Sequence, residues 1–246
     1  MTNDVQILNN GYPMPAVGLG VYKIADEQME EVVRTALDAG YRAFDTAYFY
    51  GNEKALGSAL KHSNVERDEL FITSKLWNDY QGYDQTIEYF NKSLDNLGLD
   101  YLDLFLIHWP CENDQLYIES YKALEHLYEE GKIKAIGVCN FKIHHLEKLM
   151  RETKITPQVN QIELHPYFNQ QDVQDFCDEH DIKVTASMPL MRNKGLLDDP
   201  VITDIAHRYD KTPAQIVLRW HLAHNRIIIP KSQTPKRIKE NFDIFD

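Results

Sequence analysis

The chain alternates between two hydrophobic patterns along most of its length. Short runs of nearly continuous apolar residues are followed by stretches in which apolar residues recur every three or four positions. The first pattern is typical of parallel strands buried on both faces, and the second of amphipathic helices. The expected strands cover residues 41–46, 70–75, 101–109, 132–140, 158–164, 182–187 and 226–232. The expected helices begin near residues 26, 84, 121, 143, 172, 200, 213 and 234.

Local signals set several of these boundaries. Asp26 can cap the first helix and Gly40 can end it. Thr212, Pro213 and Gln215 have the spacing of a cap, a first-turn proline and a capping-box partner. Ahead of the alternating region, residues 9–11 (Asn-Asn-Gly) lie between short apolar stretches, which predicts an N-terminal β-hairpin.

About eight strand–helix units fit into 246 residues, and most links between them are short. An open doubly wound sheet would also fit the alternation. Eight units in a chain of this length favour a closed (β/α)8 TIM barrel. We therefore expect an α/β fold, with residues 1–246 forming one barrel domain.

Composition and charge exclude some classes of binding partner. Lys and Arg total 26 against 38 Asp and Glu, so the formal charge is -12, which argues against a general binder of nucleic acid or anionic membranes. No apolar run approaches the ~20 residues of a membrane span, and the first residues do not resemble a signal peptide. Three cysteines make a poor disulfide framework. These features predict a cytoplasmic protein with a small-molecule partner.

Polar residues stand where several expected strands end. They are Asp45, Lys75, His108, Asn140 and Gln161. Each alone could be a turn, cap or packing residue. A barrel, however, brings its strand ends into one mouth, where active sites of this fold lie. Their convergence therefore predicts a catalytic site. A metal site is a weaker hypothesis, because His108 has no second ligand at a usual close spacing.

Tyr50 follows Asp45 closely and supplies a proton donor. An isolated phenol has a pKa of about 10, too high for efficient donation near neutrality. A nearby ammonium lowers that pKa, and a carboxylate can hold the charge of a buried lysine. Asp45, Lys75 and Tyr50 can form such a chain, with His108 orienting a carbonyl oxygen. This set suits proton delivery to an oxyanion formed by hydride attack.

A basic cluster near the end of the chain suggests where the hydride donor binds. Lys231 and Ser232 follow the last expected strand, and Thr234 opens a helix that carries Lys236, Arg237 and Lys239. Helix N-termini and late barrel loops are frequent phosphate sites. A basic helix face remains an alternative reading. The sequence contains no G-x-G-x-x-G, so a Rossmann cofactor site has no support.

These residues resemble the aldo-keto reductase family. The resemblance extends from GYPMPAVGLG to KENFDIFD and includes GYRAFDTAYFYGNE, LFLIHWP, IKAIGVCNF, VNQIELHPY and IPKSQTPKRIKENF. The overall pattern is most similar to the bacterial branch with diketogluconate reductases and glyoxal or methylglyoxal reductases. The resemblance implies a cytosolic, NADPH-dependent carbonyl reductase, and we expect a monomer without a metal.

By the same resemblance, Tyr50 is the proton donor, Lys75 and Asp45 tune it, and His108 positions the carbonyl. The implied cofactor-binding residues are Asn140 and Gln161 at the nicotinamide carboxamide, Leu190, then Lys231, Ser232, Thr234 and Arg237 at the 2′-phosphate, and Glu240 and Asn241 near the adenine. Tyr22, Trp77 and Trp109 match pocket-lining aromatic residues, although packing at the barrel rim would also explain them.

Three positions and the end of the chain depart from the family pattern. Cys139 replaces a serine, Ser187 stands where an aromatic ring usually stacks on nicotinamide, and Met188 stands where a serine usually meets the phosphates. The family usually continues beyond Asp246 into a segment that covers the substrate mouth, so we expect either a chain shortened there or a pocket open on that side. The departures leave open a second hypothesis, a nicotinamide-binding redox sensor or low-activity subunit on the same fold. A metal hydrolase on a barrel is a weak third.

Overall fold

The computed structural model describes residues 5–246. The strands are β1 (Val5–Ile7), β2 (Pro13–Pro15), β3 (Gly18–Gly20), β4 (Ala43–Asp45), β5 (Phe71–Leu76), β6 (Leu102–Ile107), β7 (Ile133–Cys139), β8 (Val159–Glu163), β9 (Lys183–Ser187) and β10 (Ile227–Ile228). The α-helices are α1 (Asp26–Ala39), α2 (Glu53–Lys61), α3 (Tyr83–Leu97), α4 (Asp114–Glu129), α5 (Ile143–Glu152), α6 (Gln171–Glu179), α7 (Pro200–Tyr209), α8 (Pro213–Ala223) and α9 (Pro235–Phe242).

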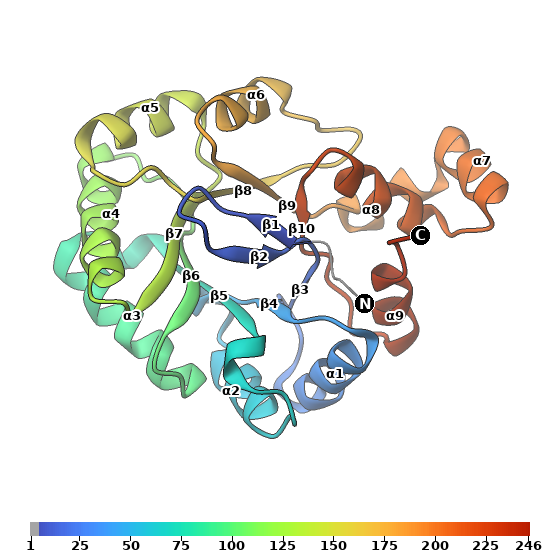
Figure 1. Ribbon diagram of the computed structural model, residues 1–246, viewed down its shortest axis with the longest axis horizontal. Helices are drawn as coiled ribbons and strands as arrows, with labels where there is room; N and C mark the ends of the chain where they lie inside the picture. Colours follow the sequence, from blue (N-terminus) through green and yellow to red (C-terminus); the bar gives the residue numbers. More distant parts are fainter. Residues whose placement is uncertain (1–4) are drawn as a thin grey trace.

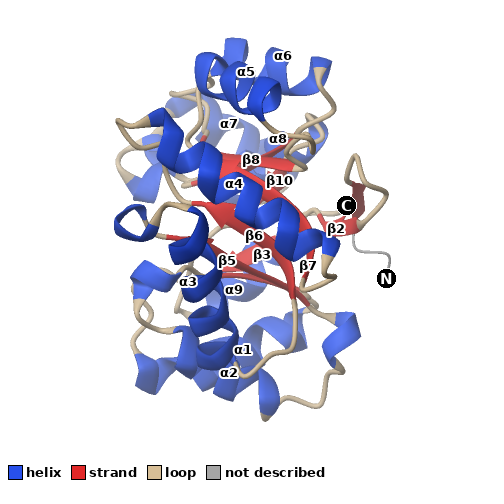
Figure 2. Cartoon of the chain, turned by 90° about the vertical axis from the view of Figure 1, so that its left-hand side faces the viewer, coloured by secondary structure: helices blue, strands red, loops and turns tan. Residues whose placement is uncertain are grey.

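Eight parallel strands form one sheet in the order β3 to β10, and this sheet closes into a barrel. The closing seam is formed by two parallel bridges, Val17 with Ile228 and Gly20 with Lys231. Helices surround the strands on the outside (Figures 1 and 2). The (β/α)8 barrel expected from the sequence is therefore confirmed.

The expected N-terminal hairpin is also confirmed, and it covers one end of the barrel. Strands β1 and β2 pair antiparallel and lie across the barrel opening in Figure 1. Leu8 and Met14 of the hairpin pack into the same buried cluster as barrel-interior residues such as Leu104 and Val159. Asn10 Nδ2 donates to the carbonyl oxygen of Lys134, 2.9 Å away at the start of β7. The hairpin thus closes the N-terminal end of the barrel and leaves the C-terminal end as the mouth.

The structure corrects several expected boundaries. Helix α1 does begin at Asp26, but its cap residue is Ala25 and no side chain bonds the helix end. Helix α4 begins at Asp114, seven residues before the expected start, because Asn113 accepts a hydrogen bond from Gln115 N. Strand β10 is only two residues long, since Pro230 has no N–H to continue the ladder. The Gly40 end of α1 and the Thr212–Gln215 capping box are confirmed.

Helix α2 was missing from the sequence-based prediction. It is nine residues long and packs closely on the end of α3. A Cβ atom added to Gly57 would lie 2.2 Å from the carbonyl oxygen of Leu97, so only glycine permits this approach. The helix matters for function because it follows directly on the turn that carries Tyr50.

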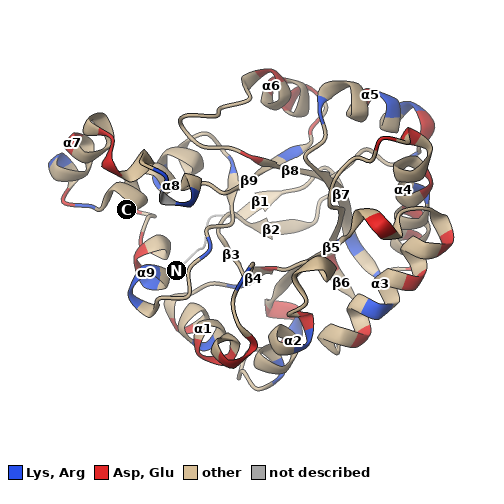
Figure 3. Ribbon diagram, turned by 180° about the vertical axis from the view of Figure 1, so that it is seen from behind, with Lys and Arg blue, Asp and Glu red and all other residues tan. Residues whose placement is uncertain are grey.

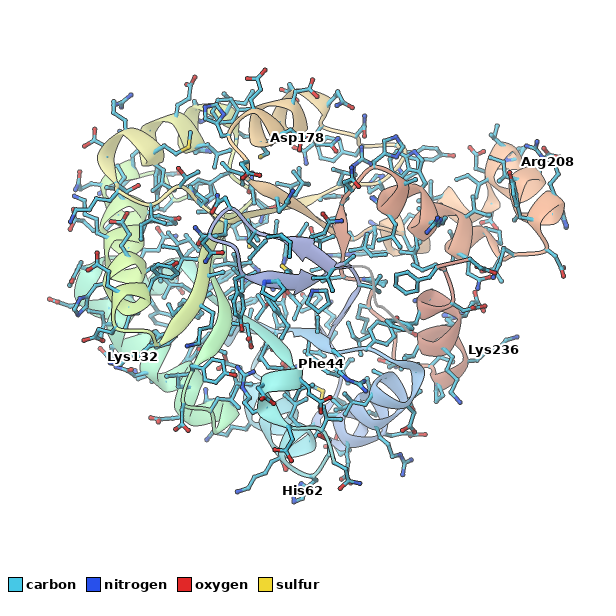
Figure 4. The ribbon with its side chains drawn as sticks, in the orientation of Figure 1. Phe44, His62, Lys132, Asp178, Arg208 and Lys236 are labelled. Atoms are coloured by element: carbon cyan, nitrogen blue, oxygen red, sulfur yellow. The ribbon has the colours of Figure 1, made fainter. Side chains whose placement is uncertain are left out.

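Helix α7 is the most peripheral of the helices. It packs against α8 and projects sideways from the barrel in Figure 1. Figure 4 shows Arg208 near the outer end of α7 and Lys236 on the outer side of α9. None of the helices among residues 5–246 is long and apolar enough to cross a membrane.

Candidate active site

A buried ion pair lies where β4 and β5 end. Lys75 Nζ is 2.5 Å from Asp45 Oδ1 and donates a second bond to the carbonyl oxygen of Thr46 at 2.9 Å. The Lys75 side chain is fully buried. Burial is the largest single effect and acts to lower the lysine pKa, but the Asp45 carboxylate together with Tyr50 and Cys139 outweighs it, and the pKa lies above its usual value. Lys75 is therefore a cation at neutral pH, as the sequence-based argument required.

Tyr50 stands beside this ion pair on a short 3-10 turn, residues Tyr48–Tyr50. Lys75 Nζ lies 5.2 Å from the centroid of the Tyr50 ring. Burial raises the pKa of Tyr50, whereas the Lys75 ammonium acts to lower it. The lysine thus works in the expected direction, but burial is the larger effect and the net shift is upward. The extent to which the phenol is buried follows from the fold and not from the local sequence.

His108 follows β6 and faces Tyr50 across the mouth. The two ring centroids are 5.8 Å apart and the ring planes are inclined by 71°. Burial, with a contribution from Lys75, lowers the pKa of His108 to about 3. Within the described part of the chain its Nδ1 atom is buried and has no partner. The imidazole is therefore neutral near pH 7, with one ring N–H to donate.

Asn140 and Gln161 lie at the neighbouring strand ends. Asn140 Nδ2 donates to the carbonyl oxygen of His108 at 3.1 Å. Gln161 Nε2 donates to Asp45 Oδ2 at 3.0 Å, so it holds the carboxylate oxygen that Lys75 does not. Cys139 is 1% exposed and packs inside the barrel beneath these residues. The strand-end residues expected to converge therefore do so.

Aromatic rings line one side of the mouth. Tyr22 packs on Tyr50 with centroids 4.8 Å apart, and Trp77 packs on His108 at 5.2 Å. Trp109 is 46% exposed. Phe49, which sequence reasoning missed, is half exposed and stacks on Trp77 at 3.8 Å. Its position next to Tyr50 was the available signal, since a turn that aims one side chain at the mouth also places its neighbours there.

The basic cluster lies where β3 meets the end of the chain. Figure 3, seen from behind, shows Lys and Arg residues on α9 and on the segment that leads into it. The side chain of Thr234 does not cap α9, and the exposed Arg237 forms no hydrogen bond or ion pair with the described residues. Burial and the nearby Lys23 lower the pKa of Lys231. Lys23 was not singled out from the sequence.

Other expected cofactor residues are engaged within the fold. Ser232 Oγ accepts from the Thr234 N–H at 3.2 Å, and Glu240 Oε1 accepts from Thr212 Oγ1 at 2.8 Å. Asn241 is 4% exposed, on the buried side of α9. An uncapped helix end with free cations nearby fits an anionic group such as phosphate.

The segment after β9 carries the residues that depart from the family pattern. Ser187 is half-buried and pairs with Glu163 of β8 in the sheet register. Met188 has a left-handed φ of 48° and lines a cavity of about 300 Å³ together with Glu163 and Arg192. Leu190 packs between two hydrophobic clusters. Met188, rather than Ser187, therefore supplies the larger side chain on this side of the mouth.

The family pattern of the aldo/keto reductases matches residues 16–246. The chain belongs to the aldo/keto reductase family. It is 49% identical to the glyoxal reductase of Bacillus subtilis (strain 168) over 244 residues, which cover 99% of this chain and 87% of that protein. It is also 49% identical to the methylglyoxal reductase DkgA of Escherichia coli O157:H7 over 240 residues, 97% of this chain and 86% of that protein. The chain is therefore an NADP-dependent oxidoreductase, as expected from the sequence.

Solved structures of this family have the same fold. An aldo/keto reductase from Brucella melitensis superposes with a TM-score of 0.96 at 48% identity, covering all of this chain and 94% of that one. A variant of Gox0644, solved in complex with NADPH, superposes with a TM-score of 0.95 at 43% identity, covering all of this chain and 89% of that one. The described residues hold no group of three or more His, Cys, Asp or Glu side chains arranged for a metal ion.

Proposed function

We propose that this protein uses NADPH to reduce small aldehydes, ketones or dicarbonyls, such as glyoxal and methylglyoxal, to alcohols. The observation that carries the proposal is the buried Asp45–Lys75 pair beside the Tyr50 phenol, faced by a neutral His108. The similarity to glyoxal and methylglyoxal reductases supports the substrate class.

Bound NADPH supplies the hydride for the carbonyl carbon. As negative charge develops on the carbonyl oxygen, Tyr50 donates its phenolic proton to it. Lys75 stabilises the tyrosinate that remains, because Asp45 keeps the lysine protonated. His108 donates a ring N–H to the same oxygen and holds the carbonyl in line.

Residues at the mouth and at the start of α9 would hold the two ends of NADPH. Asn140 and Gln161 would hold the nicotinamide carboxamide, and Gln161 Oε1 is left to accept a bond because its Nε2 is bound to Asp45. The uncapped N-terminus of α9, with Arg237 and Lys231, would hold the 2′-phosphate. Ser232, Thr234, Leu190, Glu240 and Asn241 complete the proposed site.

A direct assay tests the proposal. NADPH oxidation is followed by absorbance with glyoxal, methylglyoxal and a panel of simple aldehydes and ketones, each against a blank without carbonyl. We expect carbonyl-dependent oxidation of NADPH, with NADH a poorer donor. NADPH that binds tightly, with no oxidation above the blank for any carbonyl, would contradict the proposal and favour the redox-sensor hypothesis.

A further inference from the structure

Two buried polar residues follow directly on the Tyr50 turn and have no role in the proposed reaction. Asn52 is 3% exposed and Glu53 is 2% exposed. We propose that Glu53, with Asn52, is a positioning residue that fixes the Tyr50 phenol against the Lys75 ammonium. This inference rests on the proposed function of Tyr50 as the proton donor.

Asn52 ties the turn to the ends of β3 and β4. Its Nδ2 donates to the carbonyl oxygen of Val21 at 2.9 Å, and its Oδ1 accepts from Thr46 Oγ1 at 3.0 Å. The carbonyl oxygen of Thr46 in turn accepts from Lys75 Nζ. One residue therefore connects the end of the tyrosine turn to a residue that holds the lysine.

Glu53 ties the turn to the strand that carries Lys75. Its Oε1 accepts from Ser74 Oγ at 2.6 Å, and Ser74 is the residue before Lys75 on β5. Its Oε2 accepts from Asn96 Nδ2 of α3 at 3.0 Å. No ion pair to Glu53 forms within the part of the chain that the structure describes. Among the described residues, the buried carboxyl group is held by these hydrogen bonds and by its place in the first turn of α2.

These contacts bear on the chemistry because only two residues separate Tyr50 from Glu53. If the start of α2 shifts, the turn shifts with it, and the distance from the phenol to the ammonium changes. Lys75 acts to lower the Tyr50 pKa, so a looser turn should raise that pKa. Small displacements of a proton donor cost rate, up to about a hundredfold for 1 Å.

A purely structural role for Glu53 makes a different prediction. Loss of helix stability would reduce the amount of active protein without changing the pH dependence of the remainder. The reductase needs protonated Tyr50, so kcat falls as pH rises through the pKa of that phenol in the complex with both substrates. This fall of kcat at high pH is the alkaline limb of the pH profile. Its position distinguishes a role of Glu53 in positioning Tyr50 from a role in helix stability alone.

The experiment compares Glu53→Ala with Glu53→Gln and with Glu125→Ala in the full chain. Glu125 is a matched control, since it is 6% exposed and its Oε1 accepts two backbone N–H groups, from Lys154 and Ile155, away from the mouth. For Glu53→Ala we expect kcat to fall about tenfold, with NADPH affinity nearly unchanged, and the alkaline limb to move up by about half a pH unit or more. Glu53→Gln keeps the acceptor for Ser74, and its Nε2 can donate to Asn96 once the Asn96 amide turns its Oδ1 toward it, so this variant should retain the wild-type limb. Glu125→Ala should leave it in place.

The outcomes are distinguishable. An unmoved limb in Glu53→Ala, or an equal movement in Glu125→Ala, would overturn the inference and leave the proposed function intact. A wild-type protein without carbonyl-dependent NADPH oxidation would instead overturn the proposed function itself. If Glu53→Ala does not fold, Ser74→Ala tests the positioning role in its place, because it removes only the hydrogen bond between Ser74 and Glu53. A limb that moves up supports the inference, and an unmoved limb rejects it.

Discussion

Each end of the barrel combines a carboxylate, a cationic side chain and a phenol, but in a different order. At the mouth, the carboxylate of Asp45, the ammonium of Lys75 and the phenol of Tyr50 are neighbours. At the N-terminal end, Asp103 forms an ion pair with Arg67 at 2.7 Å and accepts a hydrogen bond from the Tyr12 hydroxyl, also at 2.7 Å.

The order decides what the phenol can do. Tyr12 bonds directly to a carboxylate, and burial together with Asp103 raises its pKa well above the usual value. At the mouth the carboxylate bonds to the lysine and to Gln161, and the cation opposes the rise in the Tyr50 pKa. A phenol next to a carboxylate keeps its proton, whereas one next to an ammonium can release it. The same three kinds of group therefore give a structural anchor at one end and, under the proposed function, a proton donor at the other.

The sharpest test of this contrast removes one hydroxyl at each end. We expect Tyr50→Phe to lose most reductase activity, ~100- to 10,000-fold in kcat, with NADPH binding nearly intact. Tyr12→Phe should keep its activity and lose about 1 kcal/mol of unfolding free energy. Steady-state kinetics and urea unfolding measure both. If hydride transfer limits the rate and Tyr50→Phe retains more than about a tenth of the wild-type kcat, the role of Tyr50 is wrong.

Removing the cation at each end extends the contrast to stability. Lys75→Met leaves the Asp45 carboxylate buried without its counter-charge, so we expect a loss of about 3–5 kcal/mol in unfolding free energy. Reductase activity should be lost as well. Arg67→Met leaves Asp103 with the Tyr12 hydroxyl and the Ile72 N–H, and the Arg67 side chain is 24% exposed. We expect a smaller loss of about 1–2 kcal/mol there. Chemical denaturation measures both losses of unfolding free energy. Equal losses would contradict the expectation that Lys75 stabilises the fold more than Arg67 does.

The arginines of the two regions differ in the same way. Arg67 donates hydrogen bonds to Asp103 and to two backbone carbonyl oxygens, whereas Arg237 donates none within the described residues. Arg237→Ala should weaken NADPH binding by about 1.5–3 kcal/mol and change NADH binding little, because only NADPH carries the 2′-phosphate. Fluorescence titration with both cofactors measures this. Equal losses would show that the basic cluster does not bind the 2′-phosphate.

The mouth also contains a buried imidazole whose pKa is displaced. The folded pKa of His108, about 3, lies below the unfolded value of about 6.5, so the unfolded chain binds the proton first. The stability from this group is complete above pH 6.5 and is lost as pH falls toward 3. Between pH 7 and pH 5 the loss from this group should be about 1–2 kcal/mol. His108→Gln should remove this part and leave the similar loss from His221, a second buried imidazole whose pKa is also lowered to about 3. Urea unfolding at both pH values tests it, with His62→Gln at an exposed position as the control.

The smallest expected effect concerns Ser187. An aromatic ring there would cover one face of the nicotinamide, and aromatic pairs contribute ~0.5–1.5 kcal/mol beyond area burial. Ser187→Tyr should therefore tighten NADPH by up to about tenfold. Unchanged or weaker binding in a folded variant would indicate that Met188, which lines the adjoining cavity, already covers this side.

The barrel and the convergence of the polar strand-end residues could be predicted from the sequence because both depend on local patterns. Apolar runs marked the strands, and a polar residue at the end of a run, such as Lys75, marked the mouth. Helix α2 was missed because Glu53 and Gly57 interrupt its short apolar face, which is stabilised by tertiary packing. Strand β10 was expected to be longer because the effect of Pro230 on the ladder was not weighed.

The electrostatics were predictable only in part. The sequence placed an ammonium near Tyr50 and gave the direction of its influence correctly. It could not give the extent of burial, which decides the net shift in the Tyr50 pKa. Glu53 was overlooked for a related reason, since a glutamate in the first turn of a helix normally faces solvent. Only the three-dimensional structure shows Ser74 and Asn96 around it.

The seam between β3 and β10 has a consequence for the order of events during synthesis. The ring closes through residues near the two ends of the sequence, Gly20 and Lys231. Contacts between such distant residues are entropically costly and form late. On the ribosome, β3 therefore emerges long before its partner, and its outer edge stays unpaired while the other strands assemble. We expect nascent chains that end before β10 to depend on chaperones, and release of the finished C-terminal segment to end that dependence.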